Sequence, residues 1–257
     1  MKAIILAAGF GSRLMPLTQN NPKCMVEYKG RKLIDYEISA LKEAGISEIA
    51  VVGGYLFEVL KQYVESQFKI KKIYQNTNFD KTNMVQTLFC ARGFLESCVR
   101  EKQDLVISYA DIVYGAETAR TLVESQAPLA IVVDKDWRSL WEKRFENPLD
   151  DAETLKIQEG KIKELGKKPK SYEEIEGQYI GLFKFSYEFL PKVLEFYDRL
   201  DRNALYDGKD FNNMYMTSFL QGLIDEFDNA KAVEIKGGWC EIDFKSDLEI
   251  EIAKFTL

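Results

Sequence analysis

The sequence of 257 residues contains no histidine, and this absence removes several classes of enzyme from consideration. Ser-His and Cys-His hydrolase triads, histidine general bases and histidine-ligated zinc all depend on an imidazole side chain. Any chemistry must therefore use carboxylates, lysine, arginine, tyrosine or backbone N–H groups, or a hard metal ion bound by oxygen atoms.

Cysteines and long apolar stretches are also scarce. The four cysteines form no C-x-x-C pair and are too few for a disulfide scaffold in a chain of this length, which predicts reduced thiols and a cytoplasmic location. The apolar run after Lys2 ends in glycines, so we expect no signal peptide. No stretch approaches the roughly 20 apolar residues of a membrane span.

Positive charge is in deficit, since 35 basic and 41 acidic residues give a net charge of −6. Proteins that coat nucleic acid or anionic membranes need basic surfaces, so we expect neither as a partner. A local basic pocket for a small anionic ligand is compatible with this balance.

The first half of the chain alternates short apolar strands with helices. We expect strands at 3–7, 49–52, 70–74, 105–109 and 129–133, and helices at 33–44, 57–68, 84–97 and 115–125. This order predicts an α/β, Rossmann-like fold with a mostly parallel central sheet and helices on both faces. Ligands of such sheets bind at the carboxyl ends of the strands.

The second half has a different pattern. Residues 134–178 are charged, with short β-like pieces at 154–158 and 161–165 that predict a small β-rich subregion. We then expect a strand at 179–185, helices at 187–200 and 213–227, a strand at 232–235, and a last helix opened by a capping box of Ser246 and Glu249. No linker separates the halves, so a single domain of residues 1–257 is the economical interpretation.

A glycine loop follows the first strand, with Gly9, Gly11, Ser12 and Arg13 in sequence and Lys23 further on. A Walker loop is excluded because no lysine follows a second glycine at the required spacing, and a dinucleotide fingerprint lacks its third glycine. Successive N–H groups and two cations suit a triphosphate. From the residues alone, a plain turn with solvated cations remains the alternative.

The segment "LAAGFGSRLMPLTQNNPKCMV" resembles the N-terminal signature of the nucleotidyltransferases that activate sugar phosphates and phosphocholine-type compounds. Their pattern is L-A-A-G-x-G-(S/T)-R-(L/M)-x-P-L-T followed by P-K. The resemblance implies the nucleotidyltransferase fold, with a nucleotide-binding half at 1–133 and an acceptor-binding, metal-completing half at 134–257. It implies catalytic roles for Arg13 and Lys23, and nucleotide contacts from Leu6, Ala8, Gly9, Gly11 and Ser12.

The same resemblance implies a Mg²⁺ site formed by Asp111, in "SYADIVYG", and Asp243, in "WCEID". Magnesium prefers oxygen ligands and takes one or two carboxylates together with substrate phosphates. Glu241, two residues before Asp243, is a rival ligand. For Asp111, a turn or helix-capping role after the strand is the alternative.

The nucleotide base is expected to contact side-chain amides in "YQNTNFDKTNMVQTL", namely Gln75, Asn76 and Asn83. Amides carry both donors and acceptors and can discriminate bases. For Asn83, an ordinary helix N-cap is an equal alternative. The stretch resembles the asparagine-bearing segment of cytidylyltransferases, which implies CTP as the donor.

The acceptor site is less clearly marked. Lys168 in "LGKKPKS" resembles the lysine of the family's K-P element, and "EGQYIGLFKFS" resembles the strand that lines the acceptor pocket, although Gln178 stands where asparagine or alanine is expected. The candidates for acceptor binding are Lys168, Gln178, Tyr179, Asn213 and Tyr215. The tryptophans at 137, 141 and 239 are candidates for a cation cage or for packing.

The whole chain most resembles short bacterial cytidylyltransferases that act on phosphocholine, aminoethylphosphonate or phosphoglutamine. This likeness implies Mg²⁺-dependent transfer of CMP from CTP to a small phosphorylated compound, with release of pyrophosphate, for surface or capsular polysaccharide modification. We expect a monomer or homodimer. The alternative is a sugar-1-phosphate nucleotidyltransferase that uses UTP or dTTP.

Overall fold

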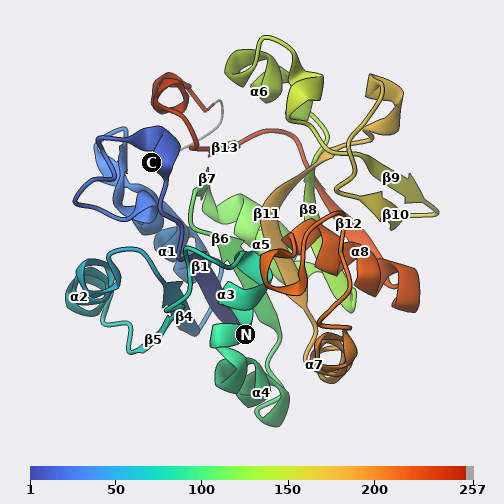
Figure 1. The fold of residues 1–257 in the computed structure, drawn as a ribbon, viewed down its shortest axis with the longest axis horizontal. Coiled ribbons are helices and arrows are strands. Elements are labelled where there is room, and N and C mark those ends of the chain that lie inside the picture. Colours follow the sequence, from blue (N-terminus) through green and yellow to red (C-terminus); the bar gives the residue numbers. More distant parts are fainter. Residues whose placement is uncertain (253–257) are drawn as a thin grey trace.

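A computed structural model describes residues 1–252 and is built around one nine-stranded sheet. Figure 1 shows α2 and the hairpin β9–β10 at opposite ends of the molecule. The strands, in their order across the sheet, are β5 (Lys72–Gln75), β4 (Glu48–Gly53), β1 (Lys2–Ala7), β6 (Leu105–Tyr109), β11 (Gln178–Phe185), β8 (Leu129–Asp134), β12 (Ala230–Ile235), β10 (Lys161–Leu165) and β9 (Leu155–Gln158).

The sheet is mostly parallel on the side formed by the first half of the chain. β5, β4, β1 and β6 run parallel to one another, whereas β11 is antiparallel to both of its neighbours, β6 and β8. The predicted β-rich subregion is the hairpin of β9 and β10, which extends the main sheet through an antiparallel contact with β12. The structure therefore confirms the expected α/β fold with a mostly parallel central sheet.

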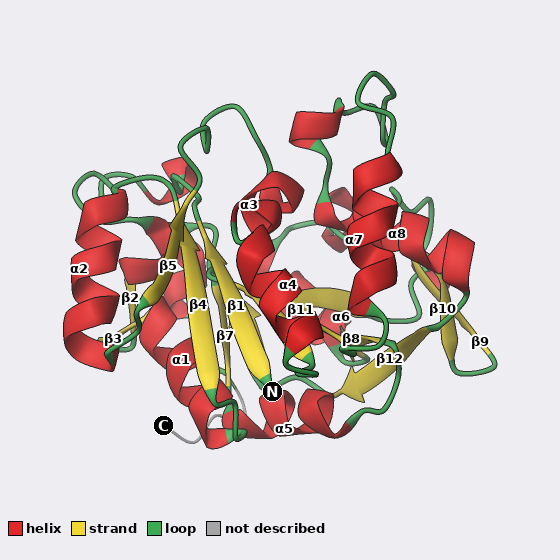
Figure 2. Cartoon of the chain, turned by 90° about the horizontal axis from the view of Figure 1, so that it is seen from below, coloured by secondary structure: helices red, strands yellow, loops and turns green. Residues whose placement is uncertain are grey.

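Helices cover both faces of the sheet because its central strands, such as β1 and β8, are buried and mostly apolar on both sides. In β1, Ile4 and Leu6 face one core, while Ala3, Ile5 and Ala7 face the other. Figure 2 shows α1 and α2 on one side of β4 and β1, with α3 and α4 on the opposite side. The helices are α1 (Leu33–Glu43), α2 (Phe57–Phe68), α3 (Met84–Cys90), α4 (Arg92–Arg100), α5 (Ala116–Glu124), α6 (Trp137–Arg144), α7 (Leu190–Arg199) and α8 (Met216–Phe227).

Two small antiparallel sheets accompany the main sheet, and one of them brings distant segments of the chain together. β2 (Glu27–Tyr28) pairs with β3 (Arg31–Lys32), and β7 (Ile112–Tyr114) pairs with β13 (Trp239–Glu241). The second pair carries the late segment of the chain to the end of β6. This pairing places residues after position 239 next to residues just after position 109.

Some predicted elements differ from the structure. The helix expected at 84–97 is two helices, α3 and α4, separated at Ala91. α6 lies in a region where no helix was expected, and the expected last helix is a short 3₁₀ helix at Lys245–Glu249. Among residues 1–252, no helix has both the length and the apolar character needed to cross a bilayer.

A buried carboxyl group lies between α1 and β6. Glu37 is fully buried, and its Oε2 accepts a hydrogen bond of 2.9 Å from the hydroxyl of Ser108. Its other oxygen has no hydrogen-bond partner among the described residues. Burial raises the pKa of Glu37 well above its ordinary value. The folded protein therefore holds a proton on Glu37 at pH values where the unfolded chain has lost it.

This proton makes stability dependent on pH. The pKa of Glu37 is raised in the folded state, so the proton on Glu37 stabilises the folded protein. This stabilisation is complete below the unfolded pKa of about 4.3 and is lost as pH rises toward the folded pKa. Glu37→Gln has no carboxyl group to titrate at this position. Between pH 5 and the folded pKa of Glu37, wild type should therefore lose about 1.4 kcal/mol of unfolding free energy per pH unit relative to the variant. Urea unfolding at several pH values measures this difference.

The control for this experiment is Glu43→Gln, at the exposed end of the same helix. The free energy of unfolding of this variant relative to wild type should stay constant over the same pH range, because the side chain of Glu43 lies in water in the folded protein. A constant difference for Glu37→Gln as well would show that Glu37 is ionised in the folded protein.

Candidate active site

The candidate site forms where the carboxyl ends of β1 and β6 meet the segment after β13. Leu6 and Tyr109 are paired across the two strands, and the N–H of Ala110 donates to the carbonyl of Leu6 at 3.1 Å. The N–H of Ile242 donates to the carbonyl of Asp111 at 2.8 Å. This backbone hydrogen bond holds the two predicted metal-binding segments side by side.

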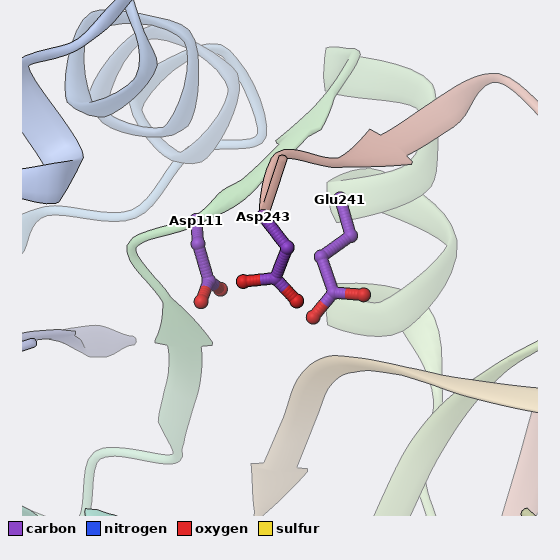
Figure 3. Close-up of side chains that lie close together, drawn as sticks. All are labelled: Asp111, Glu241 and Asp243. Carbon is purple, nitrogen blue, oxygen red and sulfur yellow. The ribbon is translucent and has the colours of Figure 1, made fainter. Parts of the chain in front are cut away.

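Three carboxylates gather at this place. Figure 3 shows the side chains of Asp111, Asp243 and Glu241 directed toward a common region, with Asp243 in the middle. One oxygen from each residue lies within 4.8 Å of the others, and Oδ1 of Asp111 is buried without a hydrogen-bond partner among the described residues. Hard oxygen donors with an unsatisfied member suit a divalent cation such as Mg²⁺.

Two cations predicted from the glycine loop contact this cluster. Nζ of Lys23 lies 2.6 Å from Oδ2 of Asp111 and 2.5 Å from Oδ1 of Asp243. Arg13 pairs with the same oxygen of Asp243 at 2.9 Å, and its guanidinium lies 4.7 Å from the ring centre of Phe244. The structure thus joins all four residues that the sequence nominated for catalysis and metal binding.

The charges of the cluster are strongly coupled. Burial disfavours the ammonium form of Lys23, but the carboxylates of Asp111 and Asp243 outweigh it and raise the pKa of Lys23. Burial also opposes ionisation of Asp243, yet Lys23 and Arg13 lower its pKa below the ordinary value. Burial and the neighbouring Asp243 raise the pKa of Glu241. A further cation at this place would favour ionisation of Glu241 and Asp243.

Arg144 is a site residue that sequence reasoning missed. Its side chain is completely buried at the end of α6, where Nη1 pairs with Glu241 at 2.8 Å and Nε lies 3.4 Å from Asp247. Asp247 in turn accepts 2.8 Å hydrogen bonds from the N–H groups of Asp243 and Phe244. Arg144 therefore holds residues 241–247 in place from the side of α6. No local pattern indicated a partner about a hundred residues away.

The glycine loop has one position that only glycine fills without strain. Gly11 has φ = +66°, and a Cβ there would lie 2.9 Å from Cβ of Lys23. The hydroxyl of the buried Thr18 donates to the carbonyl of Gly11 at 3.0 Å. The loop is thereby fixed against the segment that carries Lys23.

Two cavities meet at the carboxylate cluster. The first, of about 140 Å³, has Lys23 and Asp111 in its lining, and the second, of about 300 Å³, has Arg13, Glu241 and Asp243. Both cavities share the side chains of Asn83, Met84 and Tyr109. The acidic cluster therefore contributes to the lining of both cavities.

The residues predicted to contact the nucleotide are spread over the first cavity and its surroundings. Leu6, Ala8, Gly9 and Asn83 line this cavity, whereas Gly11 and Ser12 lie in the loop outside its lining. Asn83 is also the N-cap of α3, with its Oδ1 accepting from the N–H of Met84. The lining residues that sequence reasoning did not nominate are Ala7, Cys24, Phe79, Thr82, Met84, Thr87, Tyr109 and Ala110.

The remaining two amides lie outside the first cavity. Gln75 is exposed at the end of β5. Asn76 is buried, and its side-chain NH₂ donates to the hydroxyls of Thr82 and Thr87 at 2.9 and 3.0 Å. Its contacts thus support the turn that precedes Asn83.

Of the residues predicted to bind the acceptor, Gln178, Tyr179 and Tyr215 line the second cavity. Lys168 lies elsewhere and donates to the carbonyls of Leu149 and Asp150, both at 2.5 Å. Asn213 is also outside the lining, and its side-chain NH₂ donates to Asp210 at 3.0 Å.

Two of the three tryptophans also line the second cavity. They are Trp141 on α6 and Trp239 on β13, while Trp137 packs against Tyr172. The buried carboxylate of Asp134 accepts hydrogen bonds of 2.8 Å from Nε1 of Trp239 and from the N–H of Gly237. This contact fixes one aromatic wall of the cavity.

Comparison with known proteins agrees with the family resemblance of the glycine loop. The sequence model of the family described as "Nucleotidyl transferase" matches residues 2–242 of this chain. The chain belongs to the nucleotidyl transferase family. It is accordingly an enzyme of the class that transfers nucleotidyl groups.

Curated relatives extend this result. The chain is 65% identical over 254 residues to the CTP:phosphoglutamine cytidylyltransferase of Campylobacter jejuni subsp. jejuni serotype O:2, a match that covers 99% of this chain and all of the relative. It is 42% identical over 83 residues to a choline-phosphate cytidylyltransferase of Streptococcus pneumoniae, covering 32% of this chain and 36% of the relative.

Solved structures support the fold. The inositol-1-phosphate CTP transferase from T. maritima superposes with a TM-score of 0.75 at 19% identity, covering 96% of this chain and 90% of the other. At that level of identity the similarity concerns the fold, which is that of nucleotidyltransferases.

The burial of Arg144 leads to a stability prediction. Arg144→Met removes the positive charge that faces Glu241 and the buried acids Asp243 and Asp247, so the free energy of unfolding should fall by about 3 kcal/mol or more. The matched control is Arg138→Met on the same helix, because Arg138 makes an exposed pair with Glu142 and a contact with the ring of Tyr172, and its loss should cost about 1 kcal/mol or less. Urea unfolding at neutral pH measures both values, and equal losses would contradict the structural role of Arg144.

Proposed function

We propose that this enzyme transfers CMP from CTP to a small phosphorylated acceptor of the phosphoglutamine type and releases pyrophosphate. The observation that carries this proposal is the position of the acidic cluster at the junction of two cavities. CTP would occupy the cavity beside the glycine loop, and the acceptor the larger cavity. The full-length relative with 65% identity, a CTP:phosphoglutamine cytidylyltransferase, supports the choice of both substrates.

The acidic cluster fits a bound Mg²⁺ ion. Asp111 and Asp243 would hold it, with Glu241 as an additional carboxylate, because their oxygens lie within 4.8 Å of one another. When bound, the ion supplies neutralisation of phosphate charge and alignment of the phosphate oxygens. The other contributions come from the side chains of the chain itself.

The attacking group needs no general base, which suits a protein without histidine. A phosphomonoester has a second pKa of about 6, so its oxygen is already ionised at neutral pH and can attack the α-phosphorus of CTP. A bond forms between this oxygen and the phosphorus as the bond to the leaving pyrophosphate breaks. Lys23 and Arg13 would neutralise the phosphates, and the two cavities would hold the reacting groups in line.

The proposal divides the chain into a half at 1–133 that binds the nucleotide and a half at 134–257 that binds the acceptor and completes the metal site. Lining residues support this division, since Trp141, Tyr179 and Tyr215 belong to the second half and Leu6, Ala8 and Gly9 to the first. We place the enzyme in the cytoplasm, in line with its free cysteines, and assign its product to modification of surface polysaccharide.

Pyrophosphate release with different substrate pairs tests the proposed function. Each of CTP, UTP, dTTP, ATP and GTP is incubated with Mg²⁺ and phosphoglutamine, phosphocholine, 2-aminoethylphosphonate or glucose 1-phosphate. We expect release with CTP and a small phosphorylated acceptor that is not a sugar. Release with UTP or dTTP and glucose 1-phosphate would instead support a sugar-1-phosphate nucleotidyltransferase, and the absence of release with every pair would contradict both.

Lys23 gives a mutational test of the same scheme. Lys23→Met should lower kcat by about 100-fold or more, because the variant loses a charge that would stabilise the phosphates during transfer. Lys29→Met is the matched control, since Lys29 makes an exposed pair with Glu251 and a contact with the ring of Tyr28, and neither belongs to the acidic cluster. Its kcat should equal that of wild type. Near-normal turnover by a folded Lys23→Met enzyme would count against the scheme.

A further inference from the structure

Glu153 stands in the lining of the second cavity, just before β9. Its backbone is clamped by the buried amide of Gln178, whose Oε1 accepts from the N–H of Glu153 at 3.0 Å and whose Nε2 donates to its carbonyl at 2.5 Å. Gln178 therefore fixes the position of Glu153, and Gln178 is the residue that stands where the family resemblance predicts asparagine or alanine.

The carboxylate of Glu153 has no ion pair and no hydrogen bond to any of the residues 1–252. Burial, together with the nearby charges of Asp151 and Asp207, raises the pKa of Glu153 to about 7. A carboxyl group that is largely removed from water and faces other acids is costly to ionise without a cation. None of the basic residues in the described part of the chain pairs with Glu153.

The other acids of this cavity already have partners. Glu241 pairs with Arg144, Asp243 with Lys23 and Arg13, and Asp151 accepts a hydrogen bond of 3.1 Å from Nε1 of Trp141. Arg13 is the one basic side chain among the lining residues of this cavity in the described part of the chain. Glu153 is thus the acid that remains for a ligand.

The walls around Glu153 are aromatic. Trp141, Trp239, Tyr179 and Tyr215 line the same cavity. Aromatic faces attract cations, and a carboxylate supplies a charge-assisted partner for an ammonium group. A neutral hydroxyl group would leave the half-buried carboxylate without a compensating charge.

We propose that Glu153 binds a cationic nitrogen of the acceptor and thereby selects ammonium-bearing phosphorylated acceptors over neutral ones such as hexose phosphates. The proposal rests on the proposed function, because it assumes that the second cavity receives the acceptor. The phosphate of the acceptor would face Arg13 and the acidic cluster, and the ammonium group would lie against Glu153 and the aromatic walls. Charge at the two ends of the cavity would then fix the direction in which the acceptor enters.

Binding without turnover tests this selection. Trp141 and Trp239 line the cavity, so tryptophan fluorescence reports its occupation. Phosphoglutamine and its Nα-acetyl derivative, which lacks the ammonium charge, are titrated into wild type and into Glu153→Gln. Wild type should bind phosphoglutamine at least tenfold more tightly than the acetylated compound, and Glu153→Gln should reduce this ratio to less than threefold. Glucose 1-phosphate should bind to wild type more weakly than phosphoglutamine does, and this difference should disappear in Glu153→Gln.

Three further measurements make the test specific. Glu153→Asp keeps the charge and should retain most of the discrimination, whereas Glu146→Gln, at an exposed position outside the cavity, should behave as wild type. The Kd for CTP should be unchanged in every variant, which also shows that the variants are folded. An unchanged ratio in Glu153→Gln, or tighter binding of glucose 1-phosphate by wild type, would overturn the proposal. Because no turnover is needed, absence of pyrophosphate release would bear on the proposed function alone.

Discussion

The structure depends on the compensation of charge among three acids brought into one small volume. Asp111, Glu241 and Asp243 would repel one another if all were ionised without counter-charges. Lys23 and Arg13 compensate this charge from the glycine loop, and Arg144 compensates it from behind. These cations come from segments far apart in the sequence, so the cluster is complete only when the whole sheet and α6 are in place. Folding and the assembly of the site are for this reason the same event.

The topology explains why this cluster lies between two cavities. Parallel strands deliver the glycine loop and Asp111 to the same edge of the sheet, as open α/β sheets do. β11 then runs antiparallel next to β6, so that its first residues, including Tyr179, reach the same edge from the opposite direction. The short β7–β13 pair carries Asp243 across to Asp111. One cavity thus belongs to the parallel strands, and the other to the part of the sheet where strand direction changes.

Local sequence patterns predicted the elements, and a family motif predicted the residues of the charged cluster. The alternation of apolar runs predicted β1, β4 and β6, and the resemblance of the glycine loop to the family signature implied that Arg13 and Lys23 act at one site, although their partners Asp111 and Asp243 are remote in the sequence. Residues that belong to no such motif and whose partners are remote could not be predicted from the sequence. Arg144 looks like one more charge on a polar helix, and its burial follows from acids about a hundred residues later. Glu153 is equally inconspicuous until Gln178 fixes it in the wall of a cavity.

Gln178 also shows how the acceptor side can change while the metal side stays the same. Its amide makes its hydrogen bonds to the backbone of Glu153 and Gly177, so it shapes the cavity wall through another residue. The acidic cluster has no contact with this amide and depends on Arg144, Lys23 and Arg13. A substitution at 178 can therefore move the carboxylate of Glu153 without disturbing the charges of the acidic cluster. In the proposed scheme, chemistry that needs only positioned charges, and no histidine, would leave the lining around Glu153 free to specify a different acceptor.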